Sequence, residues 1–179
     1  MKFCTQCGST TELKVPVDDN FERYVCTNCA HTHYLNPRIV CGCIVYKEDK
    51  VLLCKRAIKP RMGLWTVPAG FMENGETTRN AAARETQEEA NINITTGKLF
   101  SISNLPHANQ VYFLYLADLG DKSYSVTPES SEIALFSKDD IPWDEIAFHT
   151  VKSSLTKYFE GLEDNHESKK NFKLHEVDF

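Results

Sequence analysis

Apolar residues in the middle of the chain occur in short runs that are separated by turn-forming segments. Residues 39–46 and 51–56 form two such runs with the charged segment 47–50 between them, which predicts a β-hairpin. Three later runs also have the length of strands, and they lie at residues 97–103, 111–118 and 133–136. This part of the chain is therefore predicted to form a sheet.

Two segments have the pattern of helices. Residues 77–91 contain four alanines and neither glycine nor proline, a composition that favours a helix. Residues 147–162 repeat apolar side chains three and four positions apart, so that one face of a helix would be apolar. Because strands are mixed with two helices, we predict an α/β (α+β) fold.

The first thirty residues carry two Cys-x2-Cys pairs with eighteen residues between them. The first pair is Cys4 with Cys7, and the second is Cys26 with Cys29. Two residues between thiols let both sulfurs reach one tetrahedral ion, and four thiolates complete the ligand set of a structural Zn²⁺. We predict a zinc ribbon in which the metal supplies folding free energy, because so short a segment buries little apolar surface.

Other cysteines and histidines have less specific interpretations. His31 and His33 could serve as alternative ligands, but four thiolates already complete the site, which favours solvated histidines. Cys41, Cys43 and Cys54 lie in predicted strands, so we expect them to be small buried residues.

Composition and charge narrow the class of protein. The chain has 179 residues, a formal net charge of −5 and 41% hydrophobic residues, which are ordinary values for a soluble globular protein. No apolar run approaches the ~20 residues needed to span a bilayer, and no leader-like segment follows Met1. We therefore expect a cytoplasmic protein without a membrane partner.

The change in composition along the sequence predicts three regions. Residues 1–36 are rich in cysteine, residues 37–162 carry the predicted strands and helices, and residues 163–179 form a charged C-terminal tail. The side-chain charges of residues 1–38 cancel, so the ribbon lacks the basic surface of a nucleic-acid module. We expect the ribbon to have a structural or dimerising role and expect no nucleic-acid partner.

A cluster of carboxylates lies on the first predicted helix. Glu85, Glu88 and Glu89 are three and four residues apart, so they share one face, where like charges destabilise a helix. A solvated acidic face is one interpretation. A bound hard cation such as Mg²⁺ or Mn²⁺ explains the cluster better, because it takes oxygen ligands. Gly70 and Gly75 would let the preceding loop fold tightly beside the carboxylates.

The full spacing resembles the Nudix box, G-x5-E-x7-R-E-U-x-E-E-x-G-U, in which U is a bulky aliphatic residue. Seven positions match: Gly70, Glu76, Arg84, Glu85, Glu88, Glu89 and Ile92. Thr86 stands where the motif has an aliphatic residue, and Asn91 stands where it has glycine. Asparagine tolerates left-handed backbone better than most residues, so we expect the turn to survive.

The resemblance extends over residues 1–162. The segment 63–70 is similar to the family's run into the box, and the preceding ribbon resembles the subgroup of NADH pyrophosphatases and ADP-ribose/FAD pyrophosphatases. Membership implies an α/β/α sandwich with a mixed sheet behind a small zinc ribbon. It also implies a homodimer that hydrolyses a nucleoside diphosphate linked to a moiety X, that is, a dinucleotide or nucleotide-sugar.

The resemblance also suggests an order of substrates. Members of the NADH branch carry the run S-Q-P-W-P-F-P after the box, and residues 101–110 lack it. Pro106 lies about where ADP-ribose-type members have a proline. We therefore expect ADP-ribose or FAD, giving AMP plus ribose 5-phosphate or FMN, with NADH as the alternative. A non-catalytic nucleotide sensor is a rival of another class, as is a nucleic-acid adaptor built on the ribbon.

The resemblance assigns roles to the matching residues. Metal ligands would be the carboxylates of Glu85, Glu88 and Glu89 and the carbonyl of Gly70, with Glu76 and Arg84 holding them in place.

Three further roles fall outside the box. The general base would come from a later loop, where Glu129 and Glu132 are candidates and Glu132 is preferred. Arg56, after an apolar strand, could bind a phosphate, and Arg61 is a weaker candidate. The sequence identifies no partner for His107 or His149. It also does not show whether the aromatic residues pack in the core or stack on a base, and these are Phe3, Tyr34, Trp65 and Tyr112.

Overall fold

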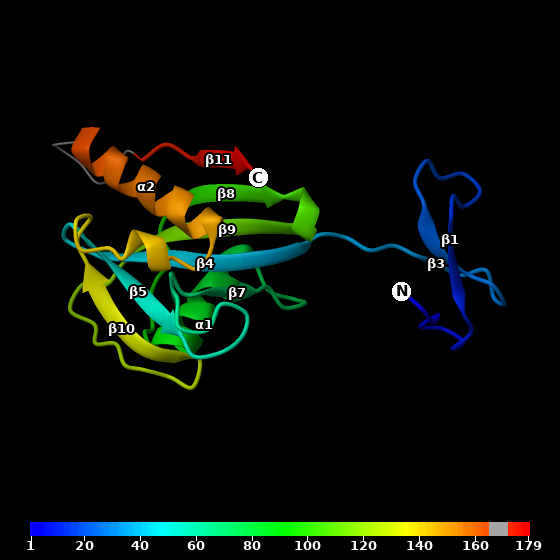
Figure 1. The fold of residues 1–179 in the computed structure, drawn as a ribbon, viewed down its shortest axis with the longest axis horizontal. Coiled ribbons are helices and arrows are strands. Elements are labelled where there is room, and N and C mark those ends of the chain that lie inside the picture. The colour runs from blue at the N-terminus through cyan, green and yellow to red at the C-terminus, as the bar shows by residue number, and fades with distance from the viewer. Residues whose placement is uncertain (165–171) are drawn as a thin grey trace. The chain divides into compact units, whose positions relative to one another are not determined.

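The structure is a computed structural model that describes residues 1–164 and 172–179. It contains two compact units, Met1–Pro37 and Arg38–Phe179, and each is described by itself. Figure 1 colours the chain from blue at the N-terminus to red at the C-terminus. From the sequence we expected this boundary after residue 36.

Within residues 1–37, all of which are described, the chain forms a three-stranded antiparallel sheet in the order β1-β2-β3. The strands are β1 (Thr11–Lys14), β2 (Arg23–Cys26) and β3 (Thr32–His33). Its buried apolar side chains are Cys4, Val25 and Cys26, while larger ones such as Phe21 are exposed. So small a core cannot stabilise a fold without further links, which agrees with the expected metal.

The described part of the second unit contains an eight-stranded mixed sheet in the order β10-β5-β4-β9-β8-β11, with β6 beside β5 and β7 beside β4. The strands are β4 (Arg38–Lys47), β5 (Lys50–Arg56), β6 (Trp65–Thr66), β7 (Ala69–Phe71), β8 (Leu99–Leu105), β9 (Gln110–Asp118), β10 (Ser130–Phe136) and β11 (His175–Asp178). The predicted hairpin is confirmed, since β4 and β5 pair at Tyr46 with Val51 and at Lys47 with Lys50. The five strands expected here from the sequence all form.

Side chains alternate between the two faces of this sheet, as the period of a strand requires. In β4, Cys43 and Val45 join the cluster that packs against α1 (Thr78–Ala90), whereas Ile44 joins the cluster that packs against α2 (His149–Asp164). Figure 1 shows the two helices on opposite sides of the sheet. The mixed α+β, α/β/α architecture expected from the sequence is thus confirmed. All three cysteines of the strands, Cys41, Cys43 and Cys54, are buried as expected.

The ends of α1 are fixed by side-chain and backbone caps. The hydroxyl of Thr77 accepts a hydrogen bond from the backbone N–H of Asn80 at 3.2 Å, which satisfies one of the free donors of the first turn. Asn91 ends the helix in the left-handed conformation (φ 57°) and donates its N–H to the carbonyl of Gln87. The expectation that asparagine can replace glycine at this turn is confirmed.

The sheet divides near one end of β4, and this division positions the site. β4 pairs with β5 only near the hairpin, and its first half pairs instead with β7 at Val40 to Gly42. Gly42 allows this approach, because a Cβ there would lie 2.3 Å from the Cβ of Ala69. β5 in turn pairs with β6 at Cys54 and Lys55. The two short strands therefore carry the loop before α1 into the gap between β4 and β5.

The end of the chain is structured where we expected a charged tail at residues 163–179. Phe172 is buried, and its ring stacks on Tyr158 of α2 with the ring centroids 5.3 Å apart. β11 then pairs in parallel with β8, from His175 opposite Ser101 to Asp178 opposite Asn104. Residues 165–171 of the expected tail lie outside the described part of the chain.

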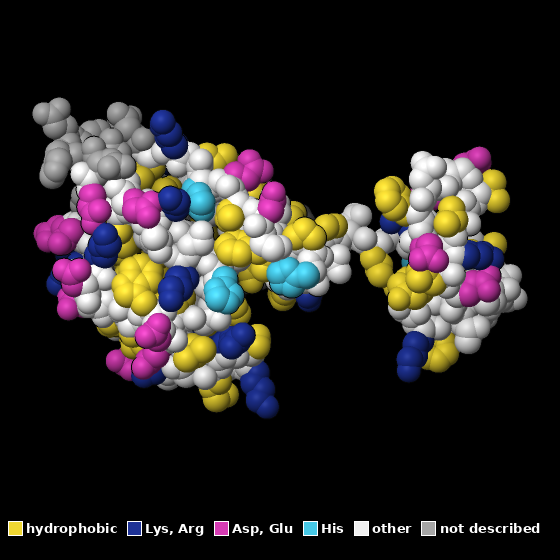
Figure 2. Space-filling view, turned by 45° about the horizontal axis from the view of Figure 1, so that its top comes forward, with side chains coloured by type: hydrophobic (Ala, Val, Ile, Leu, Met, Phe, Trp, Pro, Cys, Tyr) yellow, Lys and Arg dark blue, Asp and Glu magenta, His cyan; other side chains and the backbone are white. Residues whose placement is uncertain are grey.

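The surface of the second unit mixes charges of both signs. Figure 2 shows acidic and basic side chains interspersed over the visible face, without an extended patch of one sign. Among the described residues, no helix is both long and apolar enough to cross a membrane.

Candidate active site

A cavity of about 500 Å³ lies where the sheet divides. Its walls come from the loop after β5, from β7, from one face of α1, and from the start of β9. Of the residues proposed from the sequence, seven line this cavity, and they are Arg56, Gly70, Arg84, Glu85, Glu88, Glu89 and Glu129. The fold therefore brings together residues from β5, β7 and α1 that the sequence places up to 33 positions apart.

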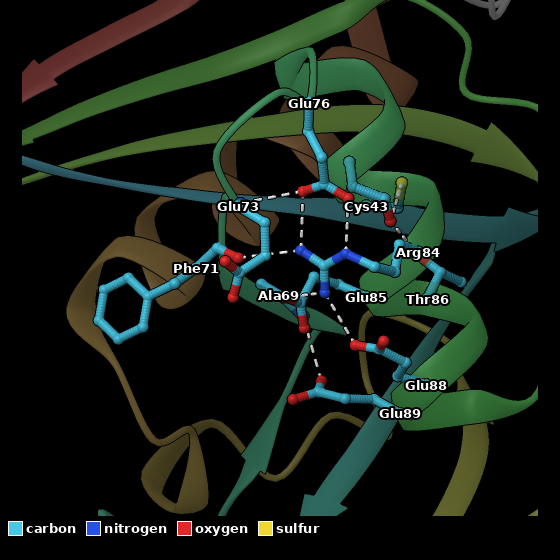
Figure 3. A network of polar contacts seen from close by, with 11 residues as sticks. Cys43, Ala69, Phe71, Glu73, Glu76, Arg84, Glu85, Thr86, Glu88 and Glu89 are labelled. Carbon is cyan, nitrogen blue, oxygen red and sulfur yellow. Dashed lines mark hydrogen bonds and ion pairs between the residues drawn. The ribbon is translucent and has the colours of Figure 1, made fainter.

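Arg84 is the centre of a network of ion pairs in this cavity (Figure 3). Its Nε and Nη2 donate to the two carboxylate oxygens of Glu76 at 2.7 and 3.0 Å, a bidentate pair. Its Nη1 donates to Glu85 at 2.7 Å and to Glu88 at 2.8 Å, and Nη2 also donates to the carbonyl of Phe71 at 2.9 Å. One guanidinium thus connects the loop after β7 to two carboxylates of α1.

Glu76 supports this arrangement without lining the cavity. Hydrogen bonds from Arg84 lower the pKa of the Glu76 carboxyl to about 2, and the backbone N–H of Glu73 also donates to it at 3.0 Å. The carboxylate is therefore ionised at neutral pH. This fits the expected role of Glu76 and Arg84 as residues that hold the ligands in place.

Two of the three helix carboxylates are buried. Glu85 is 7% exposed and Glu89 is 6% exposed, whereas Glu88 reaches the surface. Burial raises the pKa of Glu89 to about 8, although the backbone N–H of Ala69 donates to its Oε2 at 3.1 Å. Burial also raises the pKa of Glu85. Buried carboxylates that are costly to ionise are expected where a cation completes their surroundings.

The carboxylates fit a divalent cation in chemistry and position. They are hard oxygen donors at the wall of an open cavity, beside the backbone of Gly70. Their oxygens do not converge in the structure, because Arg84 holds Glu85 and Glu88 while Ala69 holds Glu89. A bound cation would therefore compete with Arg84 for the oxygens of Glu85 and Glu88.

The two candidates for the general base lie in different places. Glu129 lines the cavity. Burial is the main cause of the raised pKa values of Glu85 and Glu89, and the negative charge of Glu129 adds a smaller contribution. Glu132, which we preferred from the sequence, is exposed and pairs with Lys55 at 3.2 Å. The pairing of β10 with β5 shifts register between Ser130 and Glu132, and such a bulge re-aims the side chains that follow it. The geometry therefore favours Glu129 over Glu132.

Arg56 and Pro106 also differ in placement. Arg56 lines the cavity, donates through Nε to the carbonyl of Pro60 at 2.7 Å, and lies 5.3 Å from the ring centroid of Phe148. Pro106 is exposed in the 3-10 turn Pro106–Ala108 between β8 and β9, and it does not line the cavity. Direct contact of Pro106 with a ligand in this cavity is therefore not supported.

Sequence reasoning missed part of the wall. Phe148, Gln110 and Lys59 line the cavity, and Tyr112 does so as well, although its role could not be assigned from the sequence. Gln110 and Tyr112 reach the site because β9 runs parallel to β4, with Arg38 opposite Gln110 and Val40 opposite Tyr112. These partners are 72 residues apart, and no local pattern reveals the pairing.

The four ribbon cysteines form the second candidate site. Their sulfurs lie within 4.8 Å of one another, with Cys7 and Cys26 at 3.4 Å and Cys4 and Cys29 at 3.8 Å. Backbone N–H groups of Gln6 and Asn28 donate to sulfurs at 3.4 Å. Hydrogen bonding from Ser9 lowers the pKa of Cys7 to about 6, which favours the thiolate that a metal requires. Elsewhere in the described residues no other group of cysteine, histidine or acidic side chains converges in this way.

Comparison with known families and structures agrees with both sites. The NUDIX domain model matches residues 36–159, and the Nudix N-terminal model, a zinc ribbon, matches residues 2–35. A NUDIX hydrolase of known structure from Nitrosomonas europaea is 45% identical with a TM-score of 0.91, covering 100% of this chain and 99% of that one.

Two further relatives place limits on the comparison. The NAD-capped RNA hydrolase NudC of Photobacterium profundum is 34% identical over 135 residues, which are 74% of this chain and 47% of that protein. This chain thus spans about half the length of the curated relatives it matches. An ADP-ribose pyrophosphatase from Streptococcus suis has a TM-score of 0.60 at 18% identity, over 80% of this chain and 100% of that one, and shows the fold alone.

With two family models covering adjacent parts of its sequence, the chain belongs to the Nudix hydrolase family and carries that family's N-terminal zinc-ribbon domain.

Proposed function

We propose that this protein hydrolyses the pyrophosphate linkage of an adenosine-containing dinucleotide. The observation that carries the proposal is the set of α1 carboxylates, two of them buried, that lines a cavity of about 500 Å³ beside Arg84. A cavity of this volume accommodates a small-molecule ligand. The acidic wall requires that an anionic substrate enter with cations, which fits the expected Mg²⁺ or Mn²⁺.

The proposed ligands of that cation are the carboxylates of Glu85, Glu88 and Glu89 and the backbone carbonyl of Gly70. When bound, a divalent cation neutralises phosphate charge and lowers the pKa of a bound water. Arg84, whose guanidinium is fixed by its bidentate pair with Glu76, keeps the carboxylates of Glu85 and Glu88 at the cavity wall, and a bound cation would replace Arg84 at those oxygens.

The remaining residues of the wall act on the substrate. Arg56 and Lys59 line the same cavity as the carboxylates and would supply positive charge for the phosphates. Glu129, beside them, accepts the proton of the attacking water as the general base. Tyr112 and Phe148 supply aromatic surface against which a base can pack.

The identity of the moiety X is revised from the order proposed on sequence alone. Relatives that are 30–34% identical over most of this chain are named NAD-capped RNA hydrolases, which favours NAD(H)-type dinucleotides over ADP-ribose and FAD. The missing S-Q-P-W-P-F-P run still favours ADP-ribose or FAD as second candidates. Because the relatives' name includes RNA, we also withdraw the exclusion of a nucleic-acid-linked substrate.

A substrate panel with a paired variant tests the proposal. Wild-type protein with Mg²⁺ or Mn²⁺ is expected to cleave NADH faster than ADP-ribose, FAD or coenzyme A, with AMP as one product. Glu88→Gln should lower turnover by about two orders of magnitude or more while the folded structure is retained. If the protein binds these dinucleotides but cleaves none of them in the presence of Mg²⁺ or Mn²⁺, it is a nucleotide sensor and the proposed activity is wrong.

The ribbon and the assembly complete the proposal. We propose one structural Zn²⁺ at Cys4, Cys7, Cys26 and Cys29, supported by the convergence of the four sulfurs. We also propose a homodimer, on the family resemblance alone. Light scattering of the eluted protein should give twice the mass of the 20.4 kDa chain.

A further inference from the structure

A second cavity of about 200 Å³ adjoins the proposed pyrophosphate site. Tyr112 and Phe148 line both cavities, so the two aromatic rings form the wall that the cavities share. We infer that this side cavity is a phosphate subsite, which binds an additional phosphate carried by the adenosine ribose of an extended dinucleotide. The inference rests on the proposed function for the position of the pyrophosphate.

The lining of the side cavity has the donors that a phosphate requires. Arg61, His107 and His149 line it together, and they come from the loop after β5, the turn between β8 and β9, and the start of α2. A guanidinium matches phosphate oxygens with several donors, and an imidazole can donate a hydrogen bond in either charge state. Among the described residues, no Asp or Glu side chain lines this cavity. Figure 2 shows histidine and basic side chains near one another on the visible face of this unit.

Arg61 is available for a ligand. Its side chain is exposed, and within the part of the chain that is described it makes no hydrogen bond or ion pair. Arg56 and Arg84, by contrast, are engaged with a carbonyl and with carboxylates. An arginine that lines a cavity without a partner can bind an anion at little cost in lost interactions.

Thr150 gives independent support. It lines the side cavity, is 2% exposed, and its hydroxyl has no hydrogen-bond partner among the described residues. A buried hydroxyl without a partner is unfavourable, so a ligand atom that accepts its hydrogen bond would satisfy it. Thr150 also lies in the first turn of α2, a helix of 16 residues whose free N–H groups and dipole favour an anion.

The chemistry and the position together define the ligand. The pyrophosphate of the substrate would lie at the carboxylate wall, and one nucleoside would pass Tyr112 and Phe148. A phosphate on the 2′ or 3′ oxygen of that ribose would then reach Arg61. The same group is present as a phosphomonoester in a phosphorylated dinucleotide and as a phosphodiester where a nucleotide chain begins.

Calorimetric binding of small nucleotides tests the subsite without relying on catalysis. The probes are AMP, adenosine 2′,5′-bisphosphate and adenosine 3′,5′-bisphosphate, each titrated with Mg²⁺ into the 179-residue protein. We expect a bisphosphate to bind about tenfold tighter than AMP, and Arg61→Ala to remove that difference while leaving AMP affinity unchanged. Lys50→Ala, which removes a charge at the hairpin at the other end of β4, is the matched control and should change neither.

The outcomes separate the sources and the hypotheses. Tighter binding of the 2′ isomer indicates a phosphorylated dinucleotide, and tighter binding of the 3′ isomer indicates a nucleotide chain. In the second case, kcat/KM for NAD-capped RNA is then compared with kcat/KM for NADH. Equal affinity for AMP and both bisphosphates, or an equal loss of all three in Arg61→Ala, overturns the subsite. If the bisphosphates bind as expected but no dinucleotide is cleaved, the subsite stands and the proposed activity fails.

Discussion

The Cα of Gly70 lies against the carboxylate of Glu85. A Cβ added at Gly70 would lie 2.2 Å from Oε2 and 2.5 Å from Oε1 of Glu85, closer than any real contact allows. The glycine that begins the motif is therefore required by a neighbour 15 residues later, at the point where β7 passes the face of α1. Only a residue without a Cβ lets the carboxylate occupy this position.

Gly70→Ala is expected to inactivate the protein without unfolding it. The new methyl group must displace the Glu85 carboxylate, and a shift of about 1 Å in a ligand can cost about 100-fold in kcat. The melting temperature should change little, because a side chain at the cavity wall can move toward solvent. Steady-state kinetics and circular dichroism check this, and wild-type kcat in the variant would contradict the described approach.

Glu129→Gln is expected to lower kcat by 100-fold or more with little change in KM. Glu129 lines the cavity, and a general base contributes about 10²–10⁴-fold. Glu132→Gln is the matched control, since it removes the same charge three residues later, in β10, from a side chain paired with Lys55 at the surface. Equal effects of the two substitutions would refute the assignment of the base to Glu129.

Arg84→Lys is expected to weaken the binding of the catalytic Mg²⁺, although the positive charge of the side chain is kept. A lysine cannot make the bidentate pair with Glu76 and also reach Glu85, Glu88 and the Phe71 carbonyl. We expect the Mg²⁺ concentration for half-maximal activity to rise about 10- to 100-fold. A titration of activity against Mg²⁺ measures it, and an unchanged midpoint would show that the network does not position the ligands.

Glu89→Gln should stabilise the protein at pH 8 in buffer without added magnesium or manganese. The pKa of Glu89 in the folded state is raised to about 8 from an ordinary 4.5, so the folded protein holds a proton that the unfolded chain releases. Wild-type stability therefore falls as the pH rises from 4.5 to 8, and the glutamine variant lacks this loss. The melting temperature of the variant minus that of the wild type should increase by several degrees, about 5 °C, between pH 5 and pH 8. A difference that is flat or decreasing with pH would contradict the burial of an ionisable Glu89.

Metal analysis tests the ribbon separately from catalysis. Purified protein should contain about one zinc per chain, and Cys7→Ser should lower this content, since one of four ligands is lost. Protease sensitivity within residues 1–37 should rise as the metal is lost, because that unit has so few buried side chains. Full occupancy in the variant, or a folded ribbon without metal, would refute the site.

Elements whose structure depends on residues close together in the sequence could be predicted from the local sequence pattern. The apolar runs of β4 and β5, the alanines of α1 and the spacing of Glu85, Glu88 and Glu89 each act within a few residues, so they could be recognised without a structure. The two cysteine pairs also predicted their own convergence, because a metal site specifies its ligand spacing. The short strands β6 and β7 and the strand β11 were not predicted, since their pairing partners lie far along the chain and their own patterns are weak.

Tertiary structure alone decided which residues face the cavity. A register shift in β10 separates Glu129 from Glu132, which no periodicity of the loop reveals. The parallel pairing of β4 with β9 brings Tyr112 to the site, and the start of α2 brings Phe148. The sequence by itself determined the family, the helix carboxylates and the cysteine cluster, because their chemistry depends on local spacing. The wall that meets the substrate depends on contacts between distant segments, and only the packed sheet specifies those.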